Sequence, residues 1–162
     1  MLVPAVAFWQ VILALHIVAV VVAFGVSFAY PLFAVVGARL DRRAMPWFHR
    51  MQQVIGRRLV NPALGVVLLA GLYLASDLHQ WKAFYVQWGV GVTVVLGAIE
   101  GGFMIRNEGR LAKLAERDIA ASGAASVRWS PEYEALVKRV GAGGALMSLL
   151  VVITVYLMTV QA

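Results

Sequence analysis

Residues 5–38 read AVAFWQVILALHIVAVVVAFGVSFAYPLFAVVGA and contain no Asp, Glu, Lys or Arg. A helix crosses the hydrocarbon core of a bilayer with about 20 consecutive apolar residues, so this stretch predicts a transmembrane helix. Three later stretches are also free of charge between their end residues, namely Arg58–Asp77, Lys82–Glu100 and Arg139 to Ala162. The sequence therefore predicts an all-α bundle with four spans, at residues 5–36, 60–76, 83–105 and 138–160.

The composition bounds what else the chain can hold. It has 162 residues, of which 62% are hydrophobic, so four spans and their connections use almost the whole length. We expect a single membrane domain, residues 1–162, with no separate soluble catalytic domain. The sequence contains no cysteine, which excludes disulfides, thiolate metal sites, iron–sulfur clusters and cysteine nucleophiles.

The basic residues are segregated. Thirteen of the fourteen lie between Arg39 and Arg58 or between Arg106 and Arg139. Lys and Arg concentrate in cytoplasmic loops, so residues 37–59 and 106–137 are predicted to be cytoplasmic and both termini to lie outside the cytoplasm. The net charge of +6 then follows from the position of these loops beside the lipid bilayer. The lipid bilayer is the expected partner, and no nucleic acid is expected. A bacterial cytoplasmic membrane is the expected location.

The polar residues of the first span share one helical stripe. His16 lies well inside the apolar stretch, with Ser27 and Tyr30 further along the same face. An ionisable residue inside the membrane is costly and is a functional candidate by default. Two interpretations of His16 stay open: a ligand- or proton-binding group, or a neutral imidazole that hydrogen-bonds to a neighbouring helix.

Glu100 is the second ionisable group in a predicted span. A structural ion pair with Arg57, Arg58 or Arg106 at the membrane edge is preferred to a proton or ligand role. Matching Trp9 with Phe84 in depth places Glu100 roughly 13 Å from the level of His16, so the two are not expected to pair. The polar groups then form an outer layer of His16, Tyr73 and Trp88 and an inner layer of Ser27, Tyr30, Asn61 and Glu100.

Small residues recur on the later spans and predict close helix packing, within the bundle or between copies in a homo-oligomer. These residues are Gly89, Thr93, Gly97 and Gly101 in the third span and Gly144 and Ser148 in the fourth.

Asp77 and His79 are a weak metal candidate without a third ligand, and a polar turn is the preferred interpretation. His49, among arginines and aromatics, is expected at the membrane interface. No catalytic constellation is recognisable, so enzyme activity is not supported.

Helix boundaries are also expected from local signals. Asn61-Pro62 predicts the start of the second helix, because Asn caps helices and Pro suits the first position. Residues 106–121 predict a helical extension of the third span beyond the membrane. Ser130-Pro131-Glu132 combines a cap, a proline and an acid at the positive end of the dipole, and predicts the start of the last helix.

Leu15-His16-Ile17, Phe24-Gly25 and Tyr30-Pro31-Leu32-Phe33 resemble the first helix of copper-resistance-D and HemJ-like membrane proteins. The stretch from Gly65 to Leu74, followed by Trp81, looks like a related, uncharacterised family of four-helix integral membrane proteins. HemJ-like proteins are associated with haem and protoporphyrinogen oxidation, and the copper-resistance relatives with copper uptake. The resemblance implies that His16 is an axial ligand of a haem b.

The sequence departs from that pattern in its other ligands. It offers no second histidine or lysine inside the membrane, which the last helix is expected to reach near Val140, and no ladder of Met or His for copper. A haem with two axial ligands would need Met104, Met147 or Met158, or an open position.

The sequence leaves three functions open. The first is a membrane protein that binds haem, a metal or another small ligand within the bundle near His16. The second is an oligomeric small transporter or channel in which His16 or Glu100 takes up protons. The third is an accessory or assembly subunit of a larger membrane complex, whose glycine faces dock on partner helices.

Overall fold

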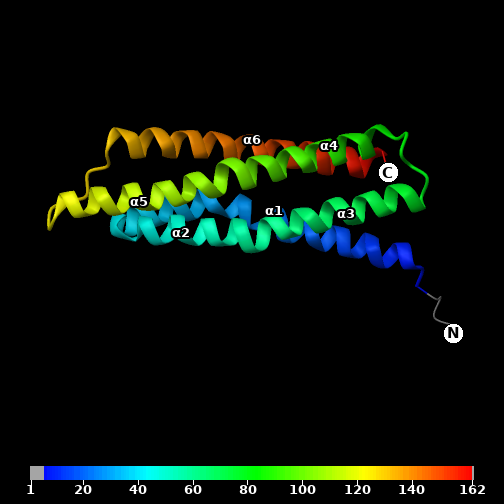
Figure 1. The fold of residues 1–162 in the computed structure, drawn as a ribbon, viewed down its shortest axis with the longest axis horizontal. Helices are drawn as coiled ribbons and strands as arrows, with labels where there is room; N and C mark the ends of the chain where they lie inside the picture. Colours follow the sequence, from blue (N-terminus) through cyan, green and yellow to red (C-terminus); the bar gives the residue numbers. More distant parts are fainter. Residues whose placement is uncertain (1–5, 162) are drawn as a thin grey trace.

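A computed structural model describes residues 6–161 and is built from four long helical rods (Figure 1). Residues 1–5 and 162, including the first residue of the predicted first span, lie outside the described residues. All four rods are long and apolar enough to cross a membrane, which confirms the predicted all-α membrane bundle at this level. The helices are α1 (Phe8–Leu40), α2 (Met45–Ile55), α3 (Asn61–Asp77), α4 (Phe84–Ile99), α5 (Ile105–Ser122) and α6 (Pro131–Gln161).

Two of the rods are composite. A 3-10 turn η1 (Arg42–Ala44) leads into α2, and a π-helical turn η2 (Gly56–Val60) joins α2 to α3 without a break. A second π-helical turn, η3 (Glu100–Met104), joins α4 to α5. π-helical turns inside long helices are uncommon and often mark functional sites. Both lie where an apolar helix passes into a more polar one.

The rods pack side by side, with α1 against α3, α2 against α5, and α4 against α3 and α6. Both described ends of the chain and the α3–α4 turn lie at one end of the bundle (Figure 1). The α1–α2 and α5–α6 connections lie at the other end, which we call the basic end because residues 39–58 and 106–139 surround it.

The interior contains two apolar cores. The membrane core is formed by side chains of α1, α3, α4 and α6, among them Ala23, Leu64, Leu96 and Met147. The basic-end core lies between α5 and α6. Its buried members are Leu111, Leu114, Ala115, Tyr133, Leu136 and Val140.

The outward faces of α1 and α6 are strongly apolar. Val11, Leu15 and Val18 of α1 and Leu149 and Val152 of α6 are all exposed. An apolar surface this continuous is rare on soluble monomers and is expected where lipid covers the helices.

The helix α3 begins at Asn61, as predicted, but Asn61 does not cap it and the helix does not start a new rod there. Asn61 has helical backbone angles (φ −60°, ψ −48°), and the rod runs through it from Met45. Proline within a helix removes one backbone donor and crowds the preceding turn. The wider π-helical turn Gly56–Val60 directly precedes Pro62, which explains how the helix continues past it.

Two other boundary predictions are confirmed. The third rod continues from the apolar α4 into the amphipathic α5, which ends at Ser122. The last helix begins at Pro131, and Ser130 caps it by accepting a hydrogen bond from the backbone N–H of Tyr133 at 3.3 Å.

Candidate functional site

His16 lies in the first half of α1 and is half-buried. Its Nδ1 is 3.0 Å from the backbone carbonyl oxygen of Val67 on α3, so Nδ1–H donates to that oxygen. Gly71 permits this approach, because a Cβ there would lie 3.3 Å from Cε1 of the imidazole. The hydrogen bond assigns the proton to Nδ1 and leaves the lone pair on Nε2. His16 is thus oriented by a neighbouring helix.

Glu100 lies at the start of the π-helical turn η3, beside the π-helical turn η2 of the neighbouring rod. Its carboxylate packs on Gly56, where an added Cβ would collide with Oε1. One residue further along, Gly101 packs against the Asn61 side chain, whose Nδ2 would lie 3.3 Å from an added Cβ. The two π-helical turns therefore meet through glycines, and Glu100 and Asn61 occupy the junction.

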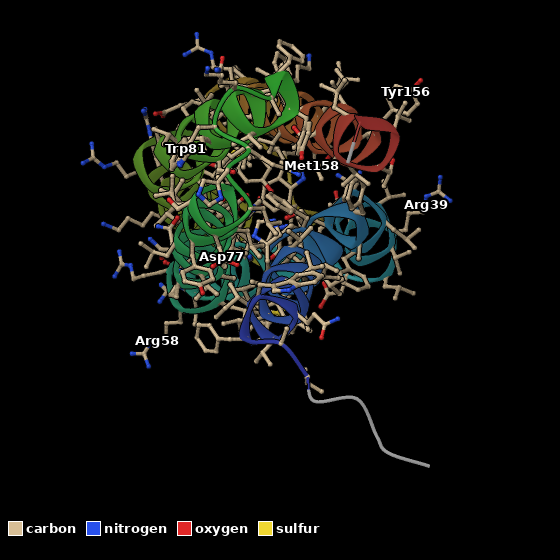
Figure 2. The ribbon with its side chains drawn as sticks, turned by 90° about the vertical axis from the view of Figure 1, so that its right-hand side faces the viewer. Arg39, Arg58, Asp77, Trp81, Tyr156 and Met158 are labelled. Atoms are coloured by element: carbon tan, nitrogen blue, oxygen red, sulfur yellow. The ribbon has the colours of Figure 1, made fainter. Side chains whose placement is uncertain are left out.

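Within residues 6–161 the Glu100 carboxylate makes neither an ion pair nor a hydrogen bond. The preferred sequence interpretation, an ion pair with Arg57, Arg58 or Arg106, is not what the structure shows. Arg58 points away from the bundle at its surface (Figure 2). A half-buried carboxyl group without a counter-charge is a candidate proton-binding group.

Tyr30 of α1 contributes a buried hydroxyl to the same region. Its phenolic oxygen is inaccessible to solvent and has no hydrogen-bond partner among the described residues. The carboxyl groups of Glu100 and Glu108 are the charged groups whose field reaches it. A buried hydroxyl without a partner is uncommon, which makes Tyr30 a candidate member of the site.

A buried polar triad lies at the basic end and joins three helices. His49 of α2 contacts Glu108 of α5 (Nδ1 to Oε2, 2.6 Å) and Tyr133 of α6 (Nε2 to the hydroxyl oxygen, 2.9 Å). His49 is 5% exposed and Glu108 is 6% exposed. The Gln52 side chain also reaches Glu108, since its amide nitrogen donates to the carboxylate in the orientation that satisfies both groups.

Two protonation patterns satisfy every member of the triad. A neutral imidazole donates from Nδ1–H to Glu108 and accepts from the Tyr133 hydroxyl at Nε2, whereas an imidazolium donates to both partners. Burial raises the pKa of the Tyr133 phenol, and the Glu108 and Asp118 carboxylates raise it further, so the hydroxyl keeps its proton at neutral pH. Both patterns keep the three side chains joined through the same two contacts.

His49, expected at the membrane interface, is buried between three helices in this triad, and Glu108 and Tyr133 were not among the predicted site residues. The sequence feature that could have identified Glu108 and Tyr133 is the spacing of apolar residues along α5 and α6. Glu108 precedes buried Leu111 and Ala115 by three and seven residues, and Tyr133 precedes buried Leu136 by three. Such spacing places all of them on the core face. A charged residue at a core-facing position of a helix indicates a candidate site more strongly than a charged residue on the polar face.

Asp118 anchors the α5–α6 connection near the triad. Its carboxylate accepts from the Ser130 backbone N–H at 2.8 Å and from the Arg117 guanidinium. Burial alone would raise the pKa of Asp118, but these hydrogen bonds outweigh it and hold the pKa below its usual value. The turn is thus held by an ionised carboxylate at neutral pH.

Trp88 and Tyr73, the other predicted outer-layer groups, contact side chains other than His16. Trp88 donates from Nε1 to the Thr154 hydroxyl at 3.0 Å, which ties α4 to α6. Tyr73 is 37% exposed and meets the ring of Phe8 edge-on. Ser27 of α1 is half-buried.

Asp77 and His79 lie at the α3–α4 turn. The imidazole of His79 donates from Nδ1 to the backbone carbonyl of Asp77 at 3.1 Å. Across residues 6–161 no three His, Asp or Glu side chains are grouped so that they could hold a metal ion.

The small residues of α4 and α6 occupy different environments. Gly89 faces Met158 of α6, whose methyl group would collide with an added Cβ, and Met158 points toward the bundle interior (Figure 2). Thr93 donates to the Gly89 carbonyl of its own helix at 2.7 Å. Gly144 lies near the Met104 methyl group, Ser148 is half-buried, and Gly97 has no atom within 4 Å of an added Cβ.

Comparisons of this chain with protein-family models, with curated proteins and with solved structures find no match.

Proposed function

We propose that this protein is a small proton-coupled transporter or channel in which Glu100 takes up and releases the proton. The observation that carries the proposal is the place of Glu100 at the junction of two π-helical turns, packed on Gly56 and without an ion pair among the described residues. Intramembrane carboxyl groups of this kind mark proton pathways. By the positive-inside rule, the basic end faces the cytoplasm of a bacterial cell.

The groups next to Glu100 support a route toward the basic end. Glu108 follows it by eight residues, about 12 Å along a helix. The buried Tyr30 hydroxyl lies in the field of both carboxyl groups, and a hydroxyl can accept and donate in the same chain of hydrogen bonds. The His49 triad extends this series of hydrogen-bonding groups at the basic end. Because a four-helix interior is narrow, we expect the transporting form to be a homo-oligomer.

We predict that Glu100→Gln reduces proton flux to the level of protein-free liposomes. Glutamine keeps the size and polarity of the side chain but cannot release a proton. The measurement is the decay of an imposed pH gradient in liposomes that hold purified protein and a pH-sensitive dye, with oligomeric state determined on the same sample. Infrared difference spectra provide a second readout, since a titrating carboxylic-acid band should be absent in the variant.

Glu134→Gln is the matched control, because Glu134 is exposed near the start of α6. It should keep wild-type flux and the titrating carboxyl band. Equal flux in wild type and Glu100→Gln, or wild-type flux no greater than that of empty liposomes, would contradict the proposal.

A second candidate function, ligand binding at His16, is favoured by the hydrogen bond to Val67. Donation from Nδ1 to a carbonyl leaves Nε2 available, and histidines that bind metals commonly have this arrangement. His16 fits as one axial ligand of a haem. Of the methionines considered as the second ligand, Met147 is buried in the membrane core, and Met104 lies near Gly144.

We predict for this candidate that protein purified from haem-replete cells shows a Soret band, and that His16→Ala abolishes it. The measurement is an absorption spectrum of the oxidised and dithionite-reduced protein. His79→Ala is the control, because His79 is an exposed histidine at the α3–α4 turn. A featureless wild-type spectrum from such cells, or a band that survives His16→Ala, would reject haem ligation by His16.

A further inference from the structure

We propose that a basic pocket between α2 and α5 binds a phosphate group. The pocket is an open surface cavity of about 360 Å³. Four of its lining residues are basic, and no acidic side chain lines it. The polar and basic members are Arg50 and Gln53 of α2 and Arg106, Arg110 and Lys113 of α5.

The floor of the pocket depends on a close approach of the two helices. Gln53 donates from Nε2 to the backbone carbonyl of Ile105 at 3.2 Å, so its amide lies across α5. Gly109 makes room for it, since an added Cβ would collide with Nε2. Arg106, Arg110 and Lys113 are spaced by four and three residues, which places them along one face of α5 above this floor.

The pocket has more basic side chains than these side chains have acidic partners nearby. Arg50 pairs with Glu116 and Arg110 with Glu132, and all four side chains are exposed. Exposed pairs of this kind contribute little free energy, so the two guanidiniums can turn to a better acceptor. Arg106 and Lys113 form no ion pair with any described residue. A phosphate group supplies the acceptor, because arginines bind it through paired N–H donors and lysine as a point charge.

The position of the pocket relates it to the membrane. Arg106 directly follows the predicted end of the third span at residue 105, so the pocket begins at the level where lipid phosphates lie. Basic pockets between helices at this level bind anionic headgroups. A soluble phosphate compound would be bound by the same donors, so the shared chemistry is the phosphate group and the test separates the two sources.

We predict that the double variant Arg106→Gln/Lys113→Gln weakens phosphatidylglycerol binding about twenty-five-fold, at roughly fivefold for each basic side chain. Lys113→Gln alone should weaken it about fivefold. The measurement is a lipid titration of delipidated protein in mild detergent, read by native mass spectrometry, with phosphatidylcholine as the zwitterionic comparison. In parallel, inorganic phosphate is added and the melting temperature is recorded.

Lys138→Gln/Arg139→Gln is the matched control, because it removes two exposed positive charges near the start of α6 and outside the pocket. Selective loss of phosphatidylglycerol binding in the pocket variant supports a lipid ligand. A phosphate-induced rise in melting temperature that only the pocket variant loses supports a soluble phosphate ligand. Unchanged behaviour of the pocket variant toward both probes, or an equal loss in the control, would overturn the proposal.

Discussion

Glu108→Ala is expected to lower the free energy of unfolding by about 3 kcal/mol, the size typical of leaving buried hydrogen-bonding groups without a partner. The change removes the acceptor of the buried His49 Nδ1–H and of the amide of half-buried Gln52. The loss should appear as a lower midpoint of denaturant unfolding in detergent. Trp129 provides a local fluorescence probe, because its ring stacks on Tyr133 at a centroid distance of 4.4 Å.

Glu116→Ala is the control for this prediction. Glu116 lies on the same helix but is exposed and pairs with exposed Arg50, so its removal should cost less than about 1 kcal/mol. Equal losses in the two variants would show that the triad does not stabilise the basic end. Glu108→Gln keeps an acceptor oxygen at nearly the same size, so it should lose less stability than Glu108→Ala.

Leu111→Ala is expected to cost about 3 kcal/mol, within the range for leucine truncations in closely packed cores. Leu111 is 1% exposed and lies in the basic-end core among α5 and α6 side chains. This core lies beyond the predicted membrane span, so its burial removes apolar surface from water and the hydrophobic effect applies in full. The truncation loses that transfer free energy and also leaves a cavity. Denaturant unfolding monitored by tryptophan fluorescence measures the loss.

Leu149→Ala is the comparison for Leu111→Ala. Leu149 is 56% exposed on α6, on a surface that faces lipid in our interpretation. Lipid chains are as apolar as leucine, so truncation there should change stability by only a few tenths of a kcal/mol. A loss at Leu149 equal to that at Leu111 would mean that this face of α6 is covered by protein rather than by lipid.

The four rods could be predicted because each contains a long uncharged stretch, which is a strong signal that depends on no neighbour. The start of the second rod could not be predicted in the same way. Asn61-Pro62 has the composition of a helix start, and only the π-helical turn before it, a property of the backbone, lets the helix pass through. Local sequence at Asn61-Pro62 favours a helix start, whereas packing of the whole rod favours a continuous helix, and the packing prevails.

The candidate site was predicted in part. Glu100 and Tyr30 are predictable because polar groups are rare in apolar helices, and the structure packs Glu100 on Gly56 and buries the Tyr30 hydroxyl. His49, Glu108 and Tyr133 meet only because of how α2, α5 and α6 pack. Glu108 and Tyr133 follow His49 by 59 and 84 positions in the chain. A single sequence carries no record of such contacts. Core-facing periodicity could have indicated that Glu108 is buried, but not its partners.

The π-helical turn at Glu100–Met104 also sets the rotational phase of the third rod. Buried positions on α4 include Val92 and Leu96, and those on α5 begin at Ile105 and Glu108, one residue later than an uninterrupted α-helix would place them. One residue corresponds to about 100° of rotation around a helix axis. The inserted residue therefore aligns the face that packs in the membrane with the face that packs beyond it. Without that offset, Glu108 and Leu111 would turn away from α2 and α6, so the membrane half and the basic end can share one helix only because its winding changes at Glu100.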